Sequence, residues 1–154
     1  MPHRPVRAVM QSRIVTLRPD MSARDAERIL AEHRLTGAPV VDDDQRVLGV
    51  VSQSDLVRLD ARPPSTATTG AFFSDVGAYD DLGRLPADES MVRLETLMSR
   101  KVLAVTPEDP LTRAARLMRQ HGVHRLLVIE DGTLRGIVSS LDLLIAIEEA
   151  RAPT

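Results

Sequence analysis

The sequence has no cysteine and no tryptophan, and its aromatic residues are two phenylalanines and one tyrosine. The absence of cysteine excludes a disulfide framework, thiolate metal sites, iron–sulfur clusters and a cysteine nucleophile. A protein without thiols suits a reducing compartment, so we expect a cytoplasmic location. No charge of one sign dominates, because 20 basic residues face 22 acidic ones and the net charge is −2. Nucleic-acid binding is therefore not expected, since it needs a basic excess on one face.

Long hydrophobic runs are also missing. No apolar segment approaches the roughly 20 residues that span a bilayer, and the first seven residues, MPHRPVR, lack the apolar stretch of a secretory signal. We therefore expect no membrane association. What the sequence does have is 43% hydrophobic residues in a chain of 154. That is enough for one ordinary domain or two very small ones.

The sequence contains an internal repeat, which appears when Pro19 is aligned with Pro107. The same offset pairs Met10 with Met98, Ala26 with Ala114, Ile29 with Leu117, Leu30 with Met118, His33 with His121, Val40 with Val128 and Val41 with Ile129. After a one-residue deletion, the segment GVVSQSDL that begins at Gly49 matches GIVSSLDL that begins at Gly136. Agreement over two stretches indicates a duplicated unit.

Each copy predicts the same order of elements, which is a strand, a helix, two hairpin strands and a last helix. In the first copy the strands are expected at about 13–17, 38–41 and 47–51, with the last helix at 53–59. In the second copy they are expected at about 101–105, 125–129 and 134–138, with the last helix at 140–149. The sequence therefore predicts an α/β protein of two stacked β-α-β-β-α repeats, because one such unit buries little surface alone.

The ends of the long helices also have recognisable signals. Ser22, with Asp25 three residues later, is typical of a helix cap. Asp109 before Pro110 predicts an N-cap followed by a proline in the first turn. Gly122 stands where a glycine stop is expected after the second helix.

The last helix of the second copy has more apolar residues than one buried stripe needs. They are Leu141, Leu143, Leu144, Ile145 and Ile147. This excess predicts packing on two sides of the helix, and a homodimer is the expected result. The alternative is that residues 71–90 cover the second side within one chain.

The connection between the copies, residues 61–90, has the composition of a linker or insertion, with PPSTATTG from Pro63 to Gly70. Phe72, Phe73 and Tyr79 follow that stretch. Large apolar groups are unfavourable in water, so we expect Phe72 and Phe73 to dock on the domain or on a partner chain. No role is assigned to Tyr79. The expected domains are thus the first repeat (1–60), the insertion (61–90) and the second repeat (91–154).

One motif occurs in both copies, with Ser52 and Asp55 in the first and Ser139 and Asp142 in the second. It places a hydroxyl and a carboxylate where a buried strand meets a helix N-terminus, which favours an anion such as phosphate. The carboxylate can accept two hydrogen bonds from the vicinal hydroxyls of a ribose. Phosphate and ribose together indicate a nucleotide. The alternative is a capping box, in which the same two side chains satisfy the helix's own N–H groups.

These residues resemble the CBS domain, the regulatory module named after cystathionine β-synthase, as a tandem pair over about 6–60 and 92–149. The features are Met10 and Met98, the TGAPVV stretch from Thr36 with its counterpart HRLLVI from His124, and both Gly-x-x-Ser-x-x-Asp ends. The resemblance implies two repeats related by a pseudo-twofold axis, with clefts between them for adenosine-containing ligands. It also implies that Asp55 and Asp142 hold ribose and that Ser52 and Ser139 meet phosphate.

The resemblance further implies an adenine pocket and phosphate-binding cations. The expected adenine residues are Ile14, Val15, Thr16, Thr36, Gly37, Ala38 and Pro39, with Val102, Leu103 and Ala104 in the second copy. His124 and Arg125 are expected to bind phosphate. For Arg125 the alternative is an ion pair with a surface carboxylate such as Glu130. No metal site is expected, because Gly122 interrupts the helix between His121 and His124.

These observations lead to a regulatory sensor of AMP, ADP or ATP that signals energy state to an unknown downstream protein. S-adenosylmethionine or a cyclic dinucleotide are further ligand candidates, and no cofactor is expected. The alternative is a structural dimerisation module without a physiological ligand. An enzyme is not expected, since the sequence has no Ser/His/Asp order, no phosphate-cradling glycine loop and no suitable pair of carboxylates, and so no catalytic residues.

Overall fold

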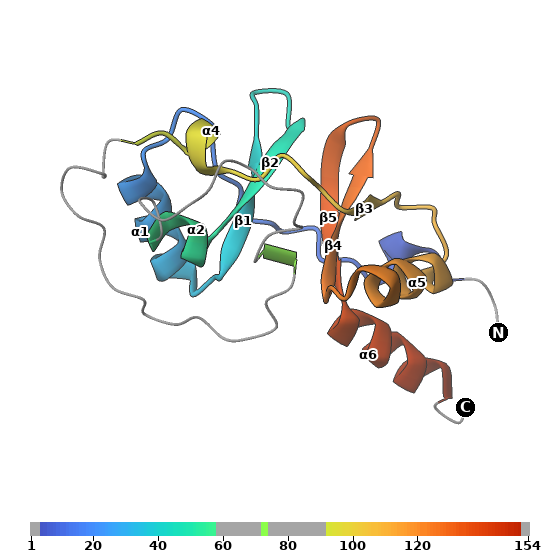
Figure 1. Ribbon diagram of the computed structural model, residues 1–154. Helices are drawn as coiled ribbons and strands as arrows, with labels where there is room; N and C mark the ends of the chain where they lie inside the picture. The colour runs from blue at the N-terminus through green and yellow to red at the C-terminus, as the bar shows by residue number, and fades with distance from the viewer. Residues whose placement is uncertain (1–3, 58–71, 74–91, 152–154) are drawn as a thin grey trace. The chain divides into compact units, whose positions relative to one another are not determined.

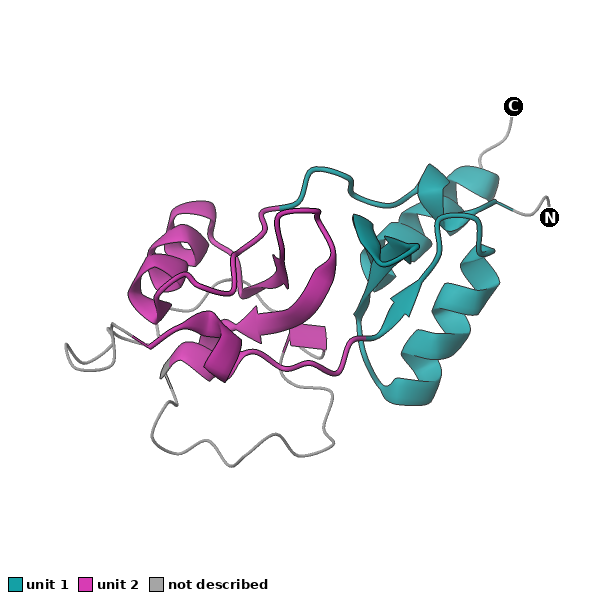
Figure 2. Ribbon diagram, turned by 90° about the horizontal axis from the view of Figure 1, so that it is seen from above, with its two compact units in different colours: residues 1–14, 103–154 teal, residues 15–102 magenta. Residues whose placement is uncertain are grey.

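The computed structural model describes residues 4–57, 72–73 and 92–151 (Figure 1). The chain divides into two compact units, coloured separately in Figure 2. Unit 1 comprises residues 1–14 and 103–154, and unit 2 comprises residues 15–102. Both units combine helices with a small sheet. Within the described part of the chain, no helix has the length and apolar character needed to cross a membrane.

Unit 2 is built around an antiparallel hairpin (Figure 1). Its elements are α1 (Ala23–His33), β1 (Gly37–Val41), β2 (Val47–Ser52), α2 (Gln53–Val57) and α4 (Leu94–Leu97). Single-residue bridges widen the sheet on both edges, with Leu17 parallel to Val40 and Ser99 antiparallel to Val50. The hairpin agrees with the predicted strands to within a residue or so, as an alternating apolar pattern around a polar turn should.

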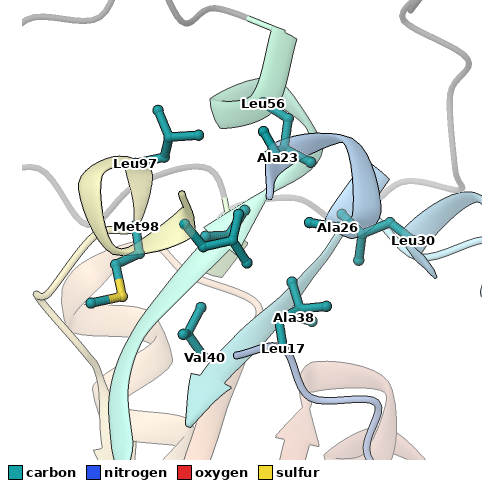
Figure 3. Packing of buried hydrophobic residues seen from close by; sticks show 11 residues of the cluster. Leu17, Ala23, Ala26, Leu30, Ala38, Val40, Leu56, Leu97 and Met98 are labelled. Carbon is teal, nitrogen blue, oxygen red and sulfur yellow. The ribbon is translucent and has the colours of Figure 1, made fainter. Parts of the chain in front are cut away.

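The core of unit 2 lies between this hairpin and α1, α2 and α4 (Figure 3). Its buried members are Leu17, Ala23, Ala26, Leu30, Ala38, Val40, Val51, Leu56, Leu94, Leu97 and Met98. On α1 the buried residues are Ala23, Ala26 and Leu30. They recur at helical spacing, so one face of α1 turns toward the sheet. His33, three residues after Leu30, is exposed.

Unit 1 repeats the plan on a three-stranded sheet of order β3-β4-β5. Its elements are η1 (Val6–Ala8), β3 (Ala104–Val105), α5 (Leu111–His121), β4 (Arg125–Glu130), β5 (Thr133–Ser139) and α6 (Ser140–Arg151). β3 runs parallel to β4, and β4 runs antiparallel to β5. Gln11 extends the far edge by pairing with Ile137. Asp131 and Gly132 both have positive φ, which is the geometry that a tight two-residue hairpin turn requires.

The segment that leads into each repeat packs in the unit formed by the other repeat. In unit 1, the amides of Val6 and Gln11 donate to the carbonyls of Asp109 and Ile137 at 2.8 Å. In unit 2, Val92 accepts from the Ala23 amide at 2.7 Å, and Ser99 exchanges two bonds with Val50. Each compact unit therefore needs chain from both repeats.

Because each lead-in segment crosses from one unit to the other, the first strand of each repeat is shorter than predicted. The chain passes from unit 1 to unit 2 after Ile14 and returns after Val102. Residues on the two sides of each junction therefore belong to different units, and only Leu17 and the pair Ala104–Val105 form β-pairs at these edges.

The helix ends follow the sequence signals with one exception. The Asp25 amide donates to Ser22 Oγ at 3.1 Å, and Gly122 ends α5 with φ 63°, so both predictions are confirmed. The predicted N-cap at Asp109 is wrong. Pro110 takes the cap position with an extended ψ of 153°, and the Asp109 carboxylate instead accepts from the Thr106 amide at 2.8 Å.

The two phenylalanines of the insertion are buried, whereas several apolar side chains of α6 are exposed. Phe72 and Phe73 are 1% and 0% exposed, and their rings meet edge to face with centroids 4.9 Å apart. Their predicted docking is confirmed, whereas Tyr79 lies outside the described residues. On α6, Leu143 and Ala146 are buried, and four apolar residues are exposed: Leu141, Leu144, Ile145 and Ile147. The chain itself leaves this apolar surface uncovered within the described residues.

Candidate functional site

In unit 2, the repeated motif lies at the junction of β2 and α2. Ser52 is fully buried as the last residue of β2, and Asp55 lies in the first turn of α2. The Ser52 amide donates to Asp55 Oδ2 at 2.9 Å, and the Asp55 amide donates to Ser52 Oγ at 3.2 Å. The Ser52 hydroxyl also lies 3.1 Å from Ser54 Oγ. These reciprocal bonds form a capping box at the start of α2.

In unit 1, the second copy has the same geometry at the junction of β5 and α6. The Ser139 amide donates to Asp142 Oδ2 at 2.9 Å, and the Asp142 amide donates to Ser139 Oγ at 3.2 Å. The helix start is also tied back to the preceding loop in both units. Gln53 donates to the Thr36 carbonyl at 2.7 Å, and Ser140 donates to the His124 carbonyl at 2.8 Å.

The capping role is thus present in both units, as one of the two sequence interpretations predicted. The cap uses only part of the hydrogen-bonding capacity of each carboxylate. A carboxylate has two oxygens with about four acceptor positions, and the reciprocal bond occupies one position on Oδ2. The cap also fixes the orientation of the carboxylate, because Oδ2 is held by the main chain. A side chain held in this way can accept further hydrogen bonds without losing rotamer freedom again.

Gln11 is a residue at this site that the sequence interpretation missed. Its side-chain amide donates to Asp142 Oδ1 at 3.3 Å, while its main chain is fixed by two bonds to Ile137. The equivalent residue in unit 2 is Ser99, which bonds to Val50 in the same way. The repeat offset that aligns Met10 with Met98 also aligns these two residues, and that was the available signal.

The residues predicted to line an adenine pocket divide between the units. Unit 2 contains Val15, Thr16, Thr36, Gly37, Ala38, Pro39 and Val102, and unit 1 contains Ile14, Leu103 and Ala104. In unit 2, the Pro39 carbonyl accepts from the Leu17 amide at 2.9 Å. In unit 1, the Leu103 carbonyl accepts from the Leu127 amide at 3.0 Å. Two of the predicted residues lie beside the motif of unit 2: Gly37 pairs with Ser52, and the Thr36 carbonyl accepts from the amide of Gln53, the residue after Ser52. The contact of the predicted residues with a ligand remains a prediction.

The two units differ most at the start of the hairpin, beside the motif serine. In unit 2, Gly37 lies opposite Ser52 across the strand pair. In unit 1, Arg125 lies opposite Ser139. Arg125 is partly buried and His124 is exposed. Glu130, named above as an alternative partner of Arg125, pairs with Arg135 at 3.2 Å.

Two further histidines, His33 and His121, stand at helix ends. His33 Nδ1 lies 2.9 Å from the Ile29 carbonyl oxygen, so the side chain satisfies one of the last carbonyls of α1. His121 is the last residue of α5 and is exposed. Among the residues that the structure describes, no three histidine or acidic side chains gather so that they could hold a metal ion.

Two units of one plan, each with a serine–aspartate pair at a strand-to-helix junction, define a tandem-repeat α/β protein. The sequence profile of the CBS domain matches residues 6–62 and 94–149. The chain therefore belongs to the CBS domain family, with two copies in tandem. This confirms the predicted resemblance and fold.

Several known proteins are similar to this chain. The CBS domain-containing protein CBSX2 (chloroplastic) of Arabidopsis thaliana is 33% identical over 128 residues, which are 80% of this chain and 54% of that protein. The crystal structure of CBSX2 in complex with AMP has 28% identity and a TM-score of 0.71, and the match covers 96% of this chain and 98% of that one.

A second solved structure is more distant. It is the CBS domain pair of protein MJ0100 in complex with 5′-methylthioadenosine and S-adenosyl-L-methionine, at 18% identity and a TM-score of 0.67, covering 97% of this chain and 100% of that one. At this identity the likeness shows the shared fold. The chain spans about half the length of the first curated relatives that it matches.

Proposed function

We propose that this chain is a non-catalytic regulatory module that binds an adenine nucleotide, AMP, ADP or ATP, through its serine–aspartate motifs. The observation that carries the proposal is the duplicated pair of reciprocal bonds, Ser52 with Asp55 and Ser139 with Asp142. Support comes from CBSX2, a relative of the same tandem architecture that has been crystallised with AMP.

The proposed chemistry assigns a separate part of the ligand to each side chain. Asp55 and Asp142 accept hydrogen bonds from the ribose hydroxyls, which are stronger than neutral bonds because the acceptor is charged. Ser52 and Ser139 meet the phosphate at the start of the following helix, where partial positive charge favours an anion. Arg125 adds a cationic donor and His124 a further hydrogen-bonding group in unit 1, and the apolar backbone at 36–39 and 102–104 contacts adenine.

The same chemistry leaves two other ligand classes as candidates. S-adenosylmethionine has the same adenosine moiety, and a cyclic dinucleotide combines ribose with phosphate. A comparative titration with AMP, ATP, S-adenosylmethionine and a cyclic dinucleotide ranks them. AMP and ATP are expected to bind most tightly, because the arginine of unit 1 suits a phosphate group.

Binding becomes a signal through differential affinity. A ligand shifts a conformational equilibrium only by the difference between its affinities for the two states. In this proposal the nucleotide favours one conformation of the tandem pair, and a downstream protein in the cytoplasm responds to that conformation. Since adenine nucleotide levels follow the energy state of the cell, the module acts as an energy sensor.

A thermal-shift assay tests the proposal. At a nucleotide concentration of about one hundred times the dissociation constant, the free energy of unfolding should rise by roughly 2.7 kcal/mol. The matched variants are Asp55→Asn and Asp142→Asn, which keep an acceptor oxygen for the cap but remove the charge. We expect the double variant to melt near the wild-type temperature without nucleotide and to lose the shift with AMP. No shift of the wild-type protein with any of the four ligands contradicts the proposal.

A second candidate function is a structural dimerisation module without a physiological ligand. Two observations favour it: both carboxylates already cap their own helices, and α6 exposes Leu141 and Leu144 at 62% and 61%. Both functions include a homodimer, so light scattering of the variant Leu141→Glu/Leu144→Glu tests that part. A dimeric wild type and a monomeric variant support dimerisation through α6. Nucleotide binding by the folded monomer then separates sensing from purely structural pairing.

A further inference from the structure

The two units offer different surroundings to otherwise identical motifs. The position opposite the motif serine is Gly37 in unit 2 and Arg125 in unit 1. Unit 1 therefore has a long cationic side chain at a place where unit 2 has no side chain. A guanidinium suits a phosphate, with its fixed fork of N–H donors.

Phe72 occupies the space that the glycine leaves. A Cβ added at Gly37 would lie 2.8 Å from Cδ1 of the Phe72 ring, 2.6 Å from the Val51 carbonyl oxygen and 3.1 Å from the Ser52 Cα. The ring thus lies against the Gly37 backbone, at the end of the hairpin where the motif begins. Phe72 is 1% exposed, so water does not reach it.

The packing of Phe72 against the Gly37 backbone leaves no room for an adenine ring between them. Carbon atoms in van der Waals contact lie about 3.5–4.0 Å apart, so nothing fits between Phe72 and Gly37. Gly37 is one of the backbone positions expected to contact adenine in unit 2. An adenine ring reaches it only if Phe72 moves, and moving a buried aromatic ring into water is unfavourable.

Within the part of the chain that the structure describes, unit 1 has no comparable group. Its stretches of sequence, 1–14 and 103–154, contain no phenylalanine, tyrosine or tryptophan. Arg125 borders the motif of unit 1, and the hydroxyl and carboxylate of that motif have the same geometry as in unit 2. The difference between the units is therefore confined to what surrounds the motif.

We propose that Phe72 closes the nucleotide site of unit 2, so that an adenine nucleotide binds first at Ser139 and Asp142 of unit 1. This inference rests on the proposed function, and it adds a self-inhibiting contact made by the insertion between the repeats. Under this arrangement the two copies of the motif respond to nucleotide at different concentrations.

Calorimetric titration with AMP tests the proposal on the full chain. The wild type is expected to bind one AMP per chain in the concentration range that saturates unit 1. Asp142→Asn should abolish that binding. In the Asp142→Asn background, Phe72→Ala should strengthen AMP binding at unit 2 by tenfold or more, and adding Asp55→Asn should remove it again.

Two controls separate opening of the site from loosening of the core. Leu30→Ala truncates another buried side chain of unit 2 and should give no AMP binding in the Asp142→Asn background. If Phe72→Ala does not fold, Phe72→Val removes the ring while keeping an apolar group, and it should give a smaller gain in affinity.

The outcomes distinguish this inference from the function on which it rests. Two AMP molecules bound with equal affinity by the wild type would overturn the role of Phe72 and leave the proposed function standing. The same holds if Asp142→Asn with intact Phe72 binds AMP as tightly as the wild type. A wild type and variants that all fail to bind AMP would overturn both.

Discussion

The two units of this protein share one plan but differ around it. The capping pairs have the same donor–acceptor distances in both, 2.9 and 3.2 Å. The neighbours differ, because unit 2 has Gly37 beneath the Phe72 ring and unit 1 has Arg125 and the amide of Gln11. The comparison teaches that the helix cap is the constant part of the duplicated motif, whereas the positions beside it differ between the units.

The last helices of the two repeats, α2 and α6, also share one buried position and differ in the residues around it. Leu56 of α2 and Leu143 of α6 occupy equivalent places, and both are buried. Beyond that shared position, α6 exposes four large apolar residues. An exposed apolar surface of this kind is typical of a protein–protein contact. The buried side of the helix is thus common to both units, and the exposed apolar side belongs to α6 alone among the described residues.

The aromatic pair should give the largest difference in stability between the units. Phe73→Ala is expected to lower the free energy of unfolding by roughly 3–5 kcal/mol, since it removes a fully buried ring and leaves a cavity. Urea unfolding measures the change, with the exposed Glu32→Ala on α1 as control at within about 0.5 kcal/mol. A cost below about 1 kcal/mol for Phe73→Ala would mean that the aromatic pair is not part of the core.

The next effect concerns the residues opposite the motif serines. Gly37→Ala should cost about 1–3 kcal/mol, because the new methyl group meets the Val51 carbonyl, which the sheet holds in place. Arg125→Ala, at the equivalent position of unit 1, should cost less, since that backbone already accommodates a side chain. Thermal unfolding of the two variants measures the difference. Equal costs would contradict the proposed contrast between the two hairpin starts.

Removing the capping carboxylate should cost a similar amount of stability in both units. Asp55→Ala and Asp142→Ala each remove the acceptor of a serine amide, and each is expected to lower the free energy of unfolding by about 1 kcal/mol. The asparagine variants should cost less, since they keep an acceptor. Urea unfolding of the four variants checks this. Costs that differ between the units by more than about 1 kcal/mol would show that the two caps are not equivalent.

The smallest expected effect belongs to Gln11. Its bond to Asp142 is long, at 3.3 Å, and exposed, so Gln11→Ala should change the free energy of unfolding by less than 1 kcal/mol. Ser99→Ala, the equivalent change in unit 2, is the matched control. We expect Gln11→Ala to alter AMP affinity at unit 1 and Ser99→Ala to leave it unchanged. Equal effects of both changes on AMP binding would remove any special role of Gln11.

Much of the fold could be predicted because its signals are local. The hairpins, the cap at Ser22 and the stop at Gly122 depend on residues within a few positions of each other. The cap at Asp109 was misplaced by one residue, because the φ of proline suits the cap position as well as the first turn. The sequence could not reveal that residues 4–14 pack in unit 1, since the partner of an edge strand is a long-range contact.

In the candidate site, too, the features with local sequence signals were predictable and the long-range contacts were not. The duplicated serine–aspartate pairs were identified from spacing, and the burial of Phe72 from the cost of exposing a ring. The partner of that ring was beyond prediction, because nothing in a linker-like segment specifies the backbone on which it docks. Gln11 was missed for a related reason: its side chain meets Asp142 across 131 positions of sequence.

The central claim is that the motif carboxylates hold a nucleotide as well as their own helices. Calorimetric titration of AMP into the wild type and into Asp55→Asn/Asp142→Asn, with melting temperatures measured in parallel, tests it most directly. The account predicts binding to the wild type, and no binding to a double variant that melts at nearly the same temperature. AMP binding of equal affinity to both proteins would contradict it.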